Sequence, residues 1–222
     1  MSDEAPVIAI DGPSASGKGT VAEKVAKALG FRYLDSGALY RLVTLAAINA
    51  RADLGDEPVL ARIAQAMEID FRDGKTWLGG RDVTADLRSE SVSAAASRVA
   101  AHPSVRRALL GRQRGFRTAP GLVADGRDMG SVVFPDAPLK VFLTADVATR
   151  AERRYKQLME KGMYAKMTDV VEELRRRDER DATRPVAPLK HYPDAIFLDT
   201  SQLTADQAVE KILSWWRERS SQ

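Results

Sequence analysis

The fold class of this chain is decided by the stretch Val7-Ile8-Ala9-Ile10-Asp11-Gly12-Pro13-Ser14-Ala15-Ser16-Gly17-Lys18. Its first part is a short apolar run of the kind found in buried parallel strands. The part from Gly12 to Lys18 fits the pattern G-x-x-x-x-G-K, in which glycines let successive backbone N–H groups face one anion. A helix after such a loop adds its positive N-terminal end, and the lysine reaches the outer phosphates. The stretch therefore predicts a strand, a phosphate-binding loop and a helix.

The predicted loop departs from the general pattern at one position. Gly19 follows Lys18 and Thr20 comes next, whereas the general pattern has a Ser or Thr hydroxyl that binds Mg²⁺ directly after the lysine. The sequence leaves open which hydroxyl, if any, contacts the metal. A Rossmann dinucleotide loop is disfavoured because G-x-G-x-x-G is missing, and a serine hydrolase is disfavoured because Ser14 and Ser16 lack a G-x-S-x-G elbow.

Strand and helix patterns alternate outward from the loop. Apolar residues recur at helical spacing from Val21 to Leu29, and Gly30 is a typical helix stop. A strand is expected at 31–34 and a helix from about 38 to 49. Further short apolar strands are expected at 122–124, 139–143 and 195–198. This alternation predicts an α/β fold with a parallel sheet.

Two other stretches complete the expected architecture. Residues 67–83 alternate apolar and polar side chains, with Asp73-Gly74 and Gly79-Gly80 as tight-turn signals, which predicts a small antiparallel meander inserted into the α/β core. Thr204-Ala205-Asp206-Gln207 has the form of a capping box and opens the last helix. The residues of that helix expected to face the sheet are Val209, Ile212, Leu213 and Trp216, with Trp215 and Trp216 in core and rim packing.

The composition is that of an ordinary globular protein. The 222 residues are 44% hydrophobic and 29% charged, enough for one core with an inserted subdomain. No apolar run approaches the roughly 20 residues of a membrane helix, and the acidic, polar start Met1–Pro6 does not predict a secretory signal. With 0 cysteines and 2 histidines, the chain offers no disulfide and no thiolate metal site. A cytoplasmic protein is expected.

Arginines gather in segments beyond the loop. The net charge of +3 and the pI of about 9.2 fit nucleic acid, a membrane surface or small polyphosphates equally well. A guanidinium is planar, permanently charged and bidentate toward phosphate oxygens, which suits it to a phosphoryl-transfer site. The candidate residues are Arg41, Arg127, the group Arg150, Arg153 and Arg154, and the run from Arg175 to Arg184.

The run from Arg175 to Arg184 supports two interpretations. Glu172 and Arg176 form a favourable i,i+4 pair, as on any solvated helix. One helix face carries the four charged residues Arg177, Arg180, Asp181 and Arg184. In a chain with a phosphate-binding loop, this second feature favours a mobile segment that clamps an anion.

A further charged pair lies in the turn Gly126-Arg127-Asp128-Met129-Gly130. This turn follows a buried-type strand, at the end of the sheet where ligands of α/β proteins bind. A tight turn accounts for the glycines, but it does not account for the adjacent Arg and Asp. The pair therefore favours a functional role.

The chain resembles the bacterial cytidylate kinases, a family of P-loop nucleoside monophosphate (NMP) kinases, over nearly its whole length. The resemblance rests on Ile10–Ser14, Leu34–Arg41, Ala124–Gly130 and Arg177–Pro188. Asp-Gly-Arg-Asp-Met-Gly and Asp-Ser-Gly-Ala are specific to that family among P-loop kinases, and G-K-G-T is the form seen in nucleoside monophosphate kinases. The resemblance implies an α/β fold of P-loop NTPase type, with five parallel strands flanked by helices, a small antiparallel insertion and a helical, Arg-rich LID.

The same resemblance implies the parts and the binding residues of a single kinase domain. The CORE comprises about 1–62, 100–148 and 186–222, the NMP-binding insertion about 63–99 and the LID about 149–185. The residues implied for ATP are Gly12, Pro13, Ser14, Ala15, Ser16, Gly17, Lys18, Gly19 and Thr20. Those implied for CMP are Arg41, Arg127 and Arg184 at the phosphate, Ser97, Arg106 and Asp128 at cytosine, Arg177 and Asp181 at the sugar, and Ser36 close to the nucleotide.

The activity implied by the resemblance is ATP-dependent phosphorylation of CMP or dCMP. Catalytic roles are implied for Lys18, Arg127 and Arg184, and for the LID arginines Arg150 and Arg154, which bridge the developing charge. Mg²⁺ is expected to arrive with ATP. The acceptor needs no general base, because the second pKa of a phosphate is about 6. A carboxylate at Asp128 suits the N4 amino donor of cytosine and disfavours the carbonyl of uracil.

Two alternatives stay open at this level. The first is a P-loop kinase for another acceptor (UMP, AMP, dTMP or shikimate), which a panel of substrates would separate. The second is a non-catalytic, nucleotide-binding regulator, which would bind nucleotide without releasing ADP. The expected partners are ATP and CMP or dCMP. Binding to nucleic acid or to a membrane is not expected, and the protein is expected to be a monomer. The preference between CMP and dCMP and the residues that contact adenine stay open.

Overall fold

The phosphate-binding loop follows the central strand of a five-stranded parallel sheet. The computed structural model of the protein describes residues 4–72 and 74–221. Within them, the strand order of this sheet is β2-β6-β1-β7-β8. The strands are β1 (Val7–Asp11), β2 (Arg32–Asp35), β6 (Leu122–Gly126), β7 (Leu139–Thr144) and β8 (Ile196–Asp199). The predicted α/β fold with a parallel sheet is confirmed.

The central strand β1 is buried along its whole length between β6 and β7. Burial on both faces explains why its sequence is a continuous apolar run rather than an alternating one. The last residue of the strand, Asp11, is in register with Gly126 of β6 and with Phe142 of β7. The segments that follow β1 and β6 therefore start side by side at the carboxyl edge of the sheet, where α/β proteins bind ligands.

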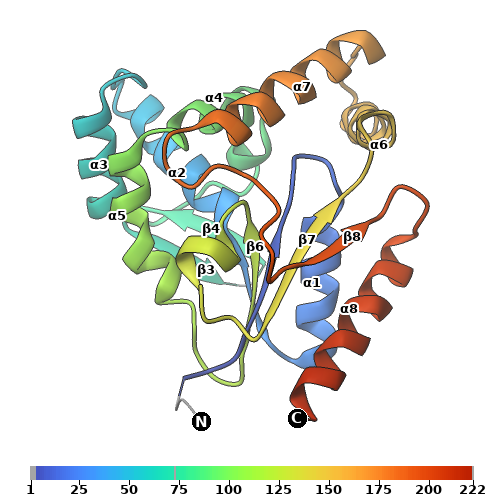
Figure 1. Cartoon of the computed structure of the whole chain (residues 1–222). Helices are drawn as coiled ribbons and strands as arrows, with labels where there is room; N and C mark the ends of the chain where they lie inside the picture. The colour runs from blue at the N-terminus through green and yellow to red at the C-terminus, as the bar shows by residue number, and fades with distance from the viewer. Residues whose placement is uncertain (1–3, 73, 222) are drawn as a thin grey trace. The chain divides into compact units, whose positions relative to one another are not determined.

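Helices α1 (Lys18–Leu29) and α8 (Ala205–Ser220) pack on the sheet and against each other (Figure 1). Val25 of α1 and Ile212 of α8 are fully buried in the same core cluster. The predicted capping box of α8 is confirmed, and Trp215 and Trp216 lie partly buried against this core, as expected. None of the described helices is long and apolar enough to cross a lipid bilayer.

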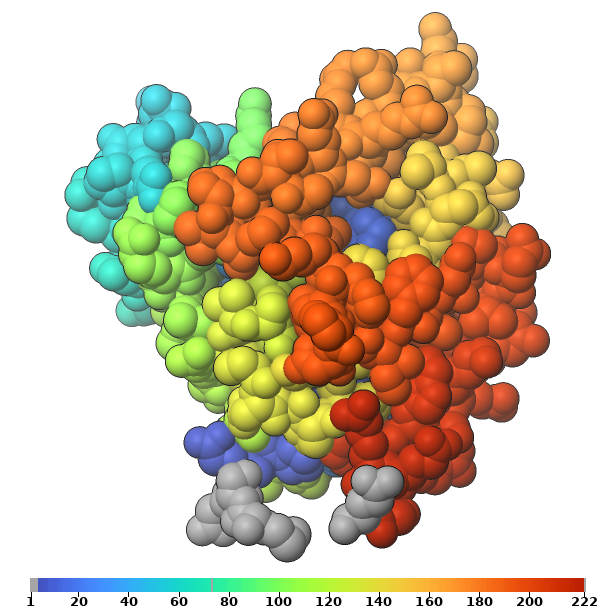
Figure 2. Space-filling model, viewed as in Figure 1, coloured from blue at the N-terminus to red at the C-terminus, as the bar shows by residue number. Residues whose placement is uncertain are grey.

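Helices α6 (Val147–Glu160) and α7 (Met167–Thr183) form a helical hairpin. They share a small core of their own, made of Ala151, Leu158, Val170 and Leu174. Figure 2 shows blue atoms from the early part of the chain at the bottom of a hollow that is bordered by α6 and α7. This hairpin carries most of the arginines identified in the sequence.

The chain divides into two compact units, and the first comprises residues up to Leu34 and from Phe116 onward. The elements described so far belong to it, apart from Asp35 at the end of β2. That unit also contains a π-helical turn, η2 (Met129–Val133), after β6. The second unit runs from Asp35 to Gly115. Its helices are α2 (Ser36–Asn49), α3 (Glu57–Ala66), the short 3-10 helix η1 (Asp86–Arg88), α4 (Glu90–Val99) and α5 (Pro103–Arg114).

The predicted antiparallel meander is confirmed in the second unit. It consists of β3 (Ile69–Arg72), β4 (Lys75–Leu78) and β5 (Arg81–Asp82), paired antiparallel in that order. The turn between β4 and β5 is made by Gly79 and Gly80, both at positive φ, as glycine readily allows. Asp73, the other residue of the first predicted turn, lies outside the described residues.

Gly12 generates a first prediction, because a Cβ atom at this position would lie 1.9 Å from the carbonyl oxygen of Leu143 on β7. We expect Gly12→Ala to lower the free energy of unfolding by about 3 kcal/mol or more, since backbone must move to relieve the clash. The control is Gly111→Ala on α5, where a Cβ meets no atom within 4 Å. The control should be neutral or stabilising by up to about 1 kcal/mol. Equal urea midpoints for the two variants would contradict the prediction.

Candidate nucleotide site

The loop between β1 and α1 presents an open helix N-terminus. Gly17, the N-cap residue of α1, has φ 90° and ψ 0°, and Ala15 also has a positive φ of 58°. The first turn of α1 has neither a side-chain cap nor an acidic residue. The hydroxyl Oγ of Ser16 is buried and has no hydrogen-bond partner among the described residues. Backbone N–H groups and a positive helix end of this kind suit an anionic ligand.

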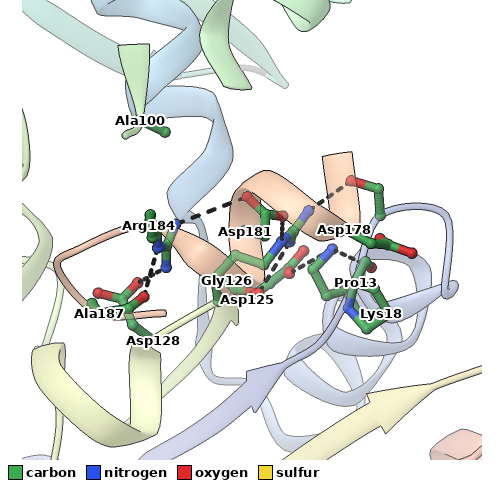
Figure 3. A network of polar contacts seen from close by, with 12 residues as sticks. Pro13, Lys18, Ala100, Asp125, Gly126, Asp128, Asp178, Asp181, Arg184 and Ala187 are labelled. Carbon is green, nitrogen blue, oxygen red and sulfur yellow. Dashed lines mark hydrogen bonds and ion pairs between the residues drawn. The ribbon is translucent and has the colours of Figure 1, made fainter. Parts of the chain in front are cut away.

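Lys18 lies at the start of α1, and its ammonium group is close to two oxygens (Figure 3). Nζ donates to the carbonyl oxygen of Pro13 at 3.4 Å and lies 3.7 Å from Oδ1 of Asp125. Asp125 belongs to β6 and also accepts a hydrogen bond of 3.3 Å from the hydroxyl of Tyr33. The lysine predicted for the outer phosphates is therefore held beside a buried carboxylate from the neighbouring strand.

The same carboxylate lies close to the unusual Gly19. A Cβ at position 19 would lie 3.2 Å from Oδ2 of Asp125 and 3.6 Å from the hydroxyl of Tyr33. The first distance is tighter than nine in ten real Cβ contacts, so a side chain here would require the Asp125 carboxylate to shift by a few tenths of an ångström. Glycine at position 19 therefore lets Asp125 lie close to the start of α1.

Arg127 connects the loop with helix α7. Its Nη2 donates to Oγ of Ser14 at 2.9 Å, and its Nε donates to Oδ2 of Asp181 at 2.8 Å. Burial opposes ionisation of Asp181, but Arg127 and Arg184 outweigh this effect and hold the pKa of that carboxyl below its usual range. Asp181 is therefore an ionised partner that holds two arginines of the predicted site.

Arg184, the C-cap residue of α7, is 7% exposed and points toward two carboxylates (Figure 3). Its Nη2 lies 3.9 Å from Oδ1 of Asp128, and its Nη1 lies 4.0 Å from Oδ1 of Asp181. Its Nε donates to the carbonyl oxygen of Ala187 at 2.6 Å. The structure thus brings Arg127, Asp128, Asp181 and Arg184 into one buried polar network.

Helix α7 has both of the faces that its sequence suggested. Glu172 and Arg176 form an exposed i,i+4 ion pair on the solvated face. On the other face, burial and the nearby Arg127 charge lower the pKa of Arg177, and Nε of both Arg177 and Arg180 is buried without a hydrogen-bond partner among the described residues. The second face therefore carries concentrated positive charge.

Arg150 of α6 is 4% exposed and is anchored on several sides. It makes a bidentate pair with Asp178 of α7, at 3.1 and 2.7 Å, and its other donors reach the carbonyl oxygens of Ser14, at 3.2 Å, and of Ala145, at 2.9 Å. It thus links both helices of the hairpin to the loop. Arg154, one turn further along α6, is half-buried.

Several residues that the sequence reasoning did not assign also hold the loop. Nη1 of Arg153 donates to the carbonyl oxygen of Ser16 at 3.0 Å, and its Nη2 donates to that of Thr200 at 2.7 Å. The Thr200 hydroxyl reaches the same Ser16 carbonyl at 3.2 Å. Arg153 was visible as part of an arginine group, but no sequence pattern indicated Thr200 as its neighbour or Asp178 as the partner of Arg150.

The second unit carries the remaining predicted residues. Asp35 caps α2 by accepting from the Ala38 N–H at 3.1 Å and pairs with Nη2 of Arg41 at 2.6 Å. Nη1 of Arg106 donates to the Ala100 carbonyl at 3.1 Å, and its guanidinium lies over the Tyr40 ring, 5.5 Å from its centroid. Of the two residues of this unit predicted for CMP that carry hydroxyls, Ser36 on α2 is buried. Ser97 is half-buried, and its buried Oγ has no hydrogen-bond partner among the described residues.

Asp11 is a further buried acid beside the loop, and it was missed as a site residue. Its carboxylate accepts the N–H groups of Met129 and Gly130, at 2.8 and 2.9 Å, and the hydroxyl of Tyr192. Burial raises the pKa of Asp11 to about 6, with a further contribution from the negative Asp128, and the three hydrogen bonds oppose the rise.

A parallel sheet, a loop that presents N–H groups and a lysine at a helix N-terminus, and converging arginines define a P-loop protein that binds phosphorylated ligands. The family model for cytidylate kinases matches residues 8–218. The chain is 57% identical over 216 residues to a cytidylate kinase of Chromobacterium violaceum, covering 97% of both chains. It is 57% identical over 213 residues to a cytidylate kinase of Bordetella bronchiseptica, covering 96% of both. The chain belongs to the cytidylate kinase family.

A solved structure supports the fold independently. A gluconokinase from Sinorhizobium meliloti 1021 superposes with a TM-score of 0.51, covering 100% of this chain and 97% of the other, at 14% identity. At an identity this low, the likeness supports the fold alone. The likeness agrees with the P-loop type of sheet expected from the sequence.

The raised pKa of Asp11 generates a prediction about stability and pH. The folded-state pKa of about 6 exceeds the ordinary value of 3.8, so the stability contributed by this group is fully present below about 3.8 and is lost as pH rises through 6. The full change is on the order of 3 kcal/mol. Urea unfolding of the wild type and of Asp11→Asn between pH 4.5 and pH 8 measures it. The wild type should lose stability relative to the variant as pH rises, and the opposite slope would show that the pKa is not raised.

Proposed function

We propose that this protein is a kinase that transfers the γ-phosphoryl group of ATP to CMP or dCMP. A phosphate oxygen of the acceptor attacks the γ-phosphorus, the bond from that phosphorus to the β-phosphate oxygen breaks, and ADP leaves. The observation that carries the proposal is the junction of Arg127 with Ser14 of the loop and with Asp181 of α7. It joins the donor loop to the arginine network. The names of the relatives support cytidine monophosphate as the acceptor.

The donor side of the proposal rests on the loop. Backbone N–H groups from Gly12 to Thr20 hold the ATP phosphates, and Lys18 neutralises the outer ones. Oxygen donors suit Mg²⁺, and the Asp125 carboxylate beside Lys18 and the buried Ser16 hydroxyl are of that kind. Mg²⁺ bound with ATP would neutralise the charge that develops on the phosphates.

The acceptor side of the proposal rests on the arginine network. Arg127 and Arg184, now paired with carboxylates, exchange part of that pairing for the acceptor phosphate, and Arg177 and Asp181 bind the sugar. The further acceptor residues, proposed from the family resemblance, are Ser36, Arg41, Ser97 and Arg106 of the second unit. With these groups in place, catalysis consists of orienting the acceptor in line and stabilising negative charge.

The helical hairpin is the proposed LID. Arg154 bridges the developing charge, and Arg150 joins it when its pair with Asp178 opens, because in the structure that pair and the Ser14 carbonyl occupy its guanidinium. The proposal includes the division into CORE, NMP-binding insertion and LID. We also propose that the protein is a monomer in the cytoplasm. A chain without cysteine forms no disulfide and so needs no oxidising compartment.

A panel of acceptors tests the proposed function. ADP release is followed by a coupled assay with ATP and each of CMP, dCMP, UMP, AMP and dTMP, and shikimate is added as a non-nucleotide acceptor. We expect CMP and dCMP to give the highest kcat/KM. Preference for another acceptor would contradict the proposed substrate, and nucleotide binding without ADP release from any acceptor would favour a regulator.

Lys18→Ala should lower kcat by about 100-fold or more, because the lysine stabilises charge that develops in the transition state. The unfolding midpoint should change little. The matched control is Lys24→Ala on the same helix, because Lys24 is exposed and pairs with the exposed Asp206. We expect near-normal turnover in the control. Turnover near that of the wild type in Lys18→Ala would remove the loop from the mechanism.

Asp128→Ala should reduce the ratio of kcat/KM for CMP to that for UMP by about 10-fold or more, because the carboxylate accepts from the cytosine N4 amino group and repels the uracil carbonyl. The exposed Asp136→Ala provides a carboxylate control, since Asp136 pairs with Arg117. Initial rates with both acceptors measure the ratio. An unchanged ratio in Asp128→Ala would show that another residue distinguishes the bases.

A further inference from the structure

Asp11 joins three segments that are far apart in the sequence. It is the last residue of β1, directly before the phosphate-binding loop, and it is 1% exposed. Its two carboxylate oxygens accept separately, Oδ1 from the N–H of Met129 and Oδ2 from the N–H of Gly130. Oδ2 also accepts from the hydroxyl of Tyr192, which lies on the segment that leads from α7 to β8.

The first of these junctions fixes the backbone directly after Asp128. Met129 and Gly130 begin the turn η2, whose N-cap residue is Asp128, and this N-cap has no side-chain hydrogen bond of its own to the turn. The two N–H groups at the start of η2 are instead satisfied by Asp11. The direction in which the Asp128 side chain leaves the backbone therefore depends on the Asp11 carboxylate.

The second junction fixes the segment that follows Arg184. Near its start, the N–H of Leu189 donates to the carbonyl oxygen of Asp181 at 2.7 Å. Further along, the Tyr192 hydroxyl is held by Asp11. A Cβ on Gly130 would lie 3.1 Å from Cγ of Lys140 and 3.2 Å from that hydroxyl, so glycine at 130 leaves room for both side chains. The segment is thus held to α7 at Leu189 and to Asp11, beside the turn that starts from Asp128, at Tyr192.

We propose that Asp11 and Tyr192 are positioning residues for the acceptor nucleotide, which hold Asp128 and Arg184 in the mutual arrangement that recognises base and phosphate. The identity of the acceptor rests on the proposed function, whereas the positioning role rests on the contacts. The 3.9 Å separation of Arg184 Nη2 and Asp128 Oδ1 is the geometry that this network maintains.

A carboxylate at position 11 carries a cost of burial that its hydrogen bonds oppose. The charged and titratable groups near it are Asp128, which is negative, Arg127, which is positive, and Tyr192, whose pKa is raised by burial and by the Asp11 charge. Burial disfavours the ionised form of Asp11, and an apolar side chain in the core would avoid that cost. An ionised carboxylate is the side chain that can accept from two backbone N–H groups and a phenol at once. The three hydrogen bonds of Asp11 therefore fit a role in positioning η2 and Tyr192.

The test is Tyr192→Phe, which removes a single hydroxyl and keeps the ring. We expect KM for CMP to rise about 10-fold and the CMP-to-UMP ratio of kcat/KM to fall several-fold, since one hydrogen bond to a charged group is lost. KM for ATP should stay within about 2-fold, because the hydroxyl bonds to the Asp11 side chain that holds η2 and not to the loop from Gly12 to Thr20. The control is Asp194→Asn on the same segment, which weakens a pair with Lys140 and should leave all three values unchanged. Calorimetric titration with CMP alone reports the same shift as a dissociation constant.

The outcomes separate this inference from the proposed function. Unchanged KM for CMP and an unchanged base ratio in Tyr192→Phe overturn the positioning role, and so does a parallel rise in KM for CMP and for ATP, which marks general loosening. Asp11→Asn should shift the same acceptor parameters in the same direction, and a shift confined to ATP would also overturn it. If the wild type prefers another acceptor, the proposed substrate fails, and the comparison is repeated with that acceptor.

Discussion

The parallel register of β1 and β6 is the constraint on which the site depends. It pairs Asp11 with Gly126, so the phosphate-binding loop and the Arg127 turn leave the sheet at the same level and side by side. The close approach of Gly12 to the carbonyl of Leu143 locks β1 on its other side. Two loops far apart in sequence therefore meet through backbone pairing, before any side chain contributes.

Pairing of basic side chains with carboxylates is the second feature on which the site depends. Lys18, Arg127, Arg150 and Arg184 all lie beside carboxylates, respectively Asp125, Asp181, Asp178 and both Asp128 and Asp181. A buried cation that lost its partner would be strongly destabilising, so these carboxylates keep the arginines in place. A phosphate offers the same bidentate acceptor geometry as a carboxylate. Ligand binding can thus replace one anion by another without leaving a buried guanidinium unpaired.

Much of this could be predicted from the sequence, for reasons that differ between elements. The strands of the parallel sheet and helices α1, α2 and α8 follow from apolar periodicity, and the meander and the capping box of α8 follow from local turn and cap chemistry. Helices α3, α4 and α5 were not predicted. The loop and the family were recognisable because their patterns are contiguous. Thr200, Asp178 and Tyr192 were missed because each acts only through a partner distant in sequence, such as Tyr192 with Asp11 across 181 positions. Such pairings depend on tertiary packing, which local patterns do not encode.

Gly19 shows how a local exception becomes intelligible only in three dimensions. In the sequence it is a glycine where a hydroxyl is expected, and the pattern gives no reason for it. In the structure a Cβ there would press on Asp125, which β6 brings beside Lys18. A carboxylate from the neighbouring strand thus lies beside the position at which the general loop pattern has a hydroxyl. Gly19 and Asp125 are therefore in contact, and a change at either position affects the space of the other.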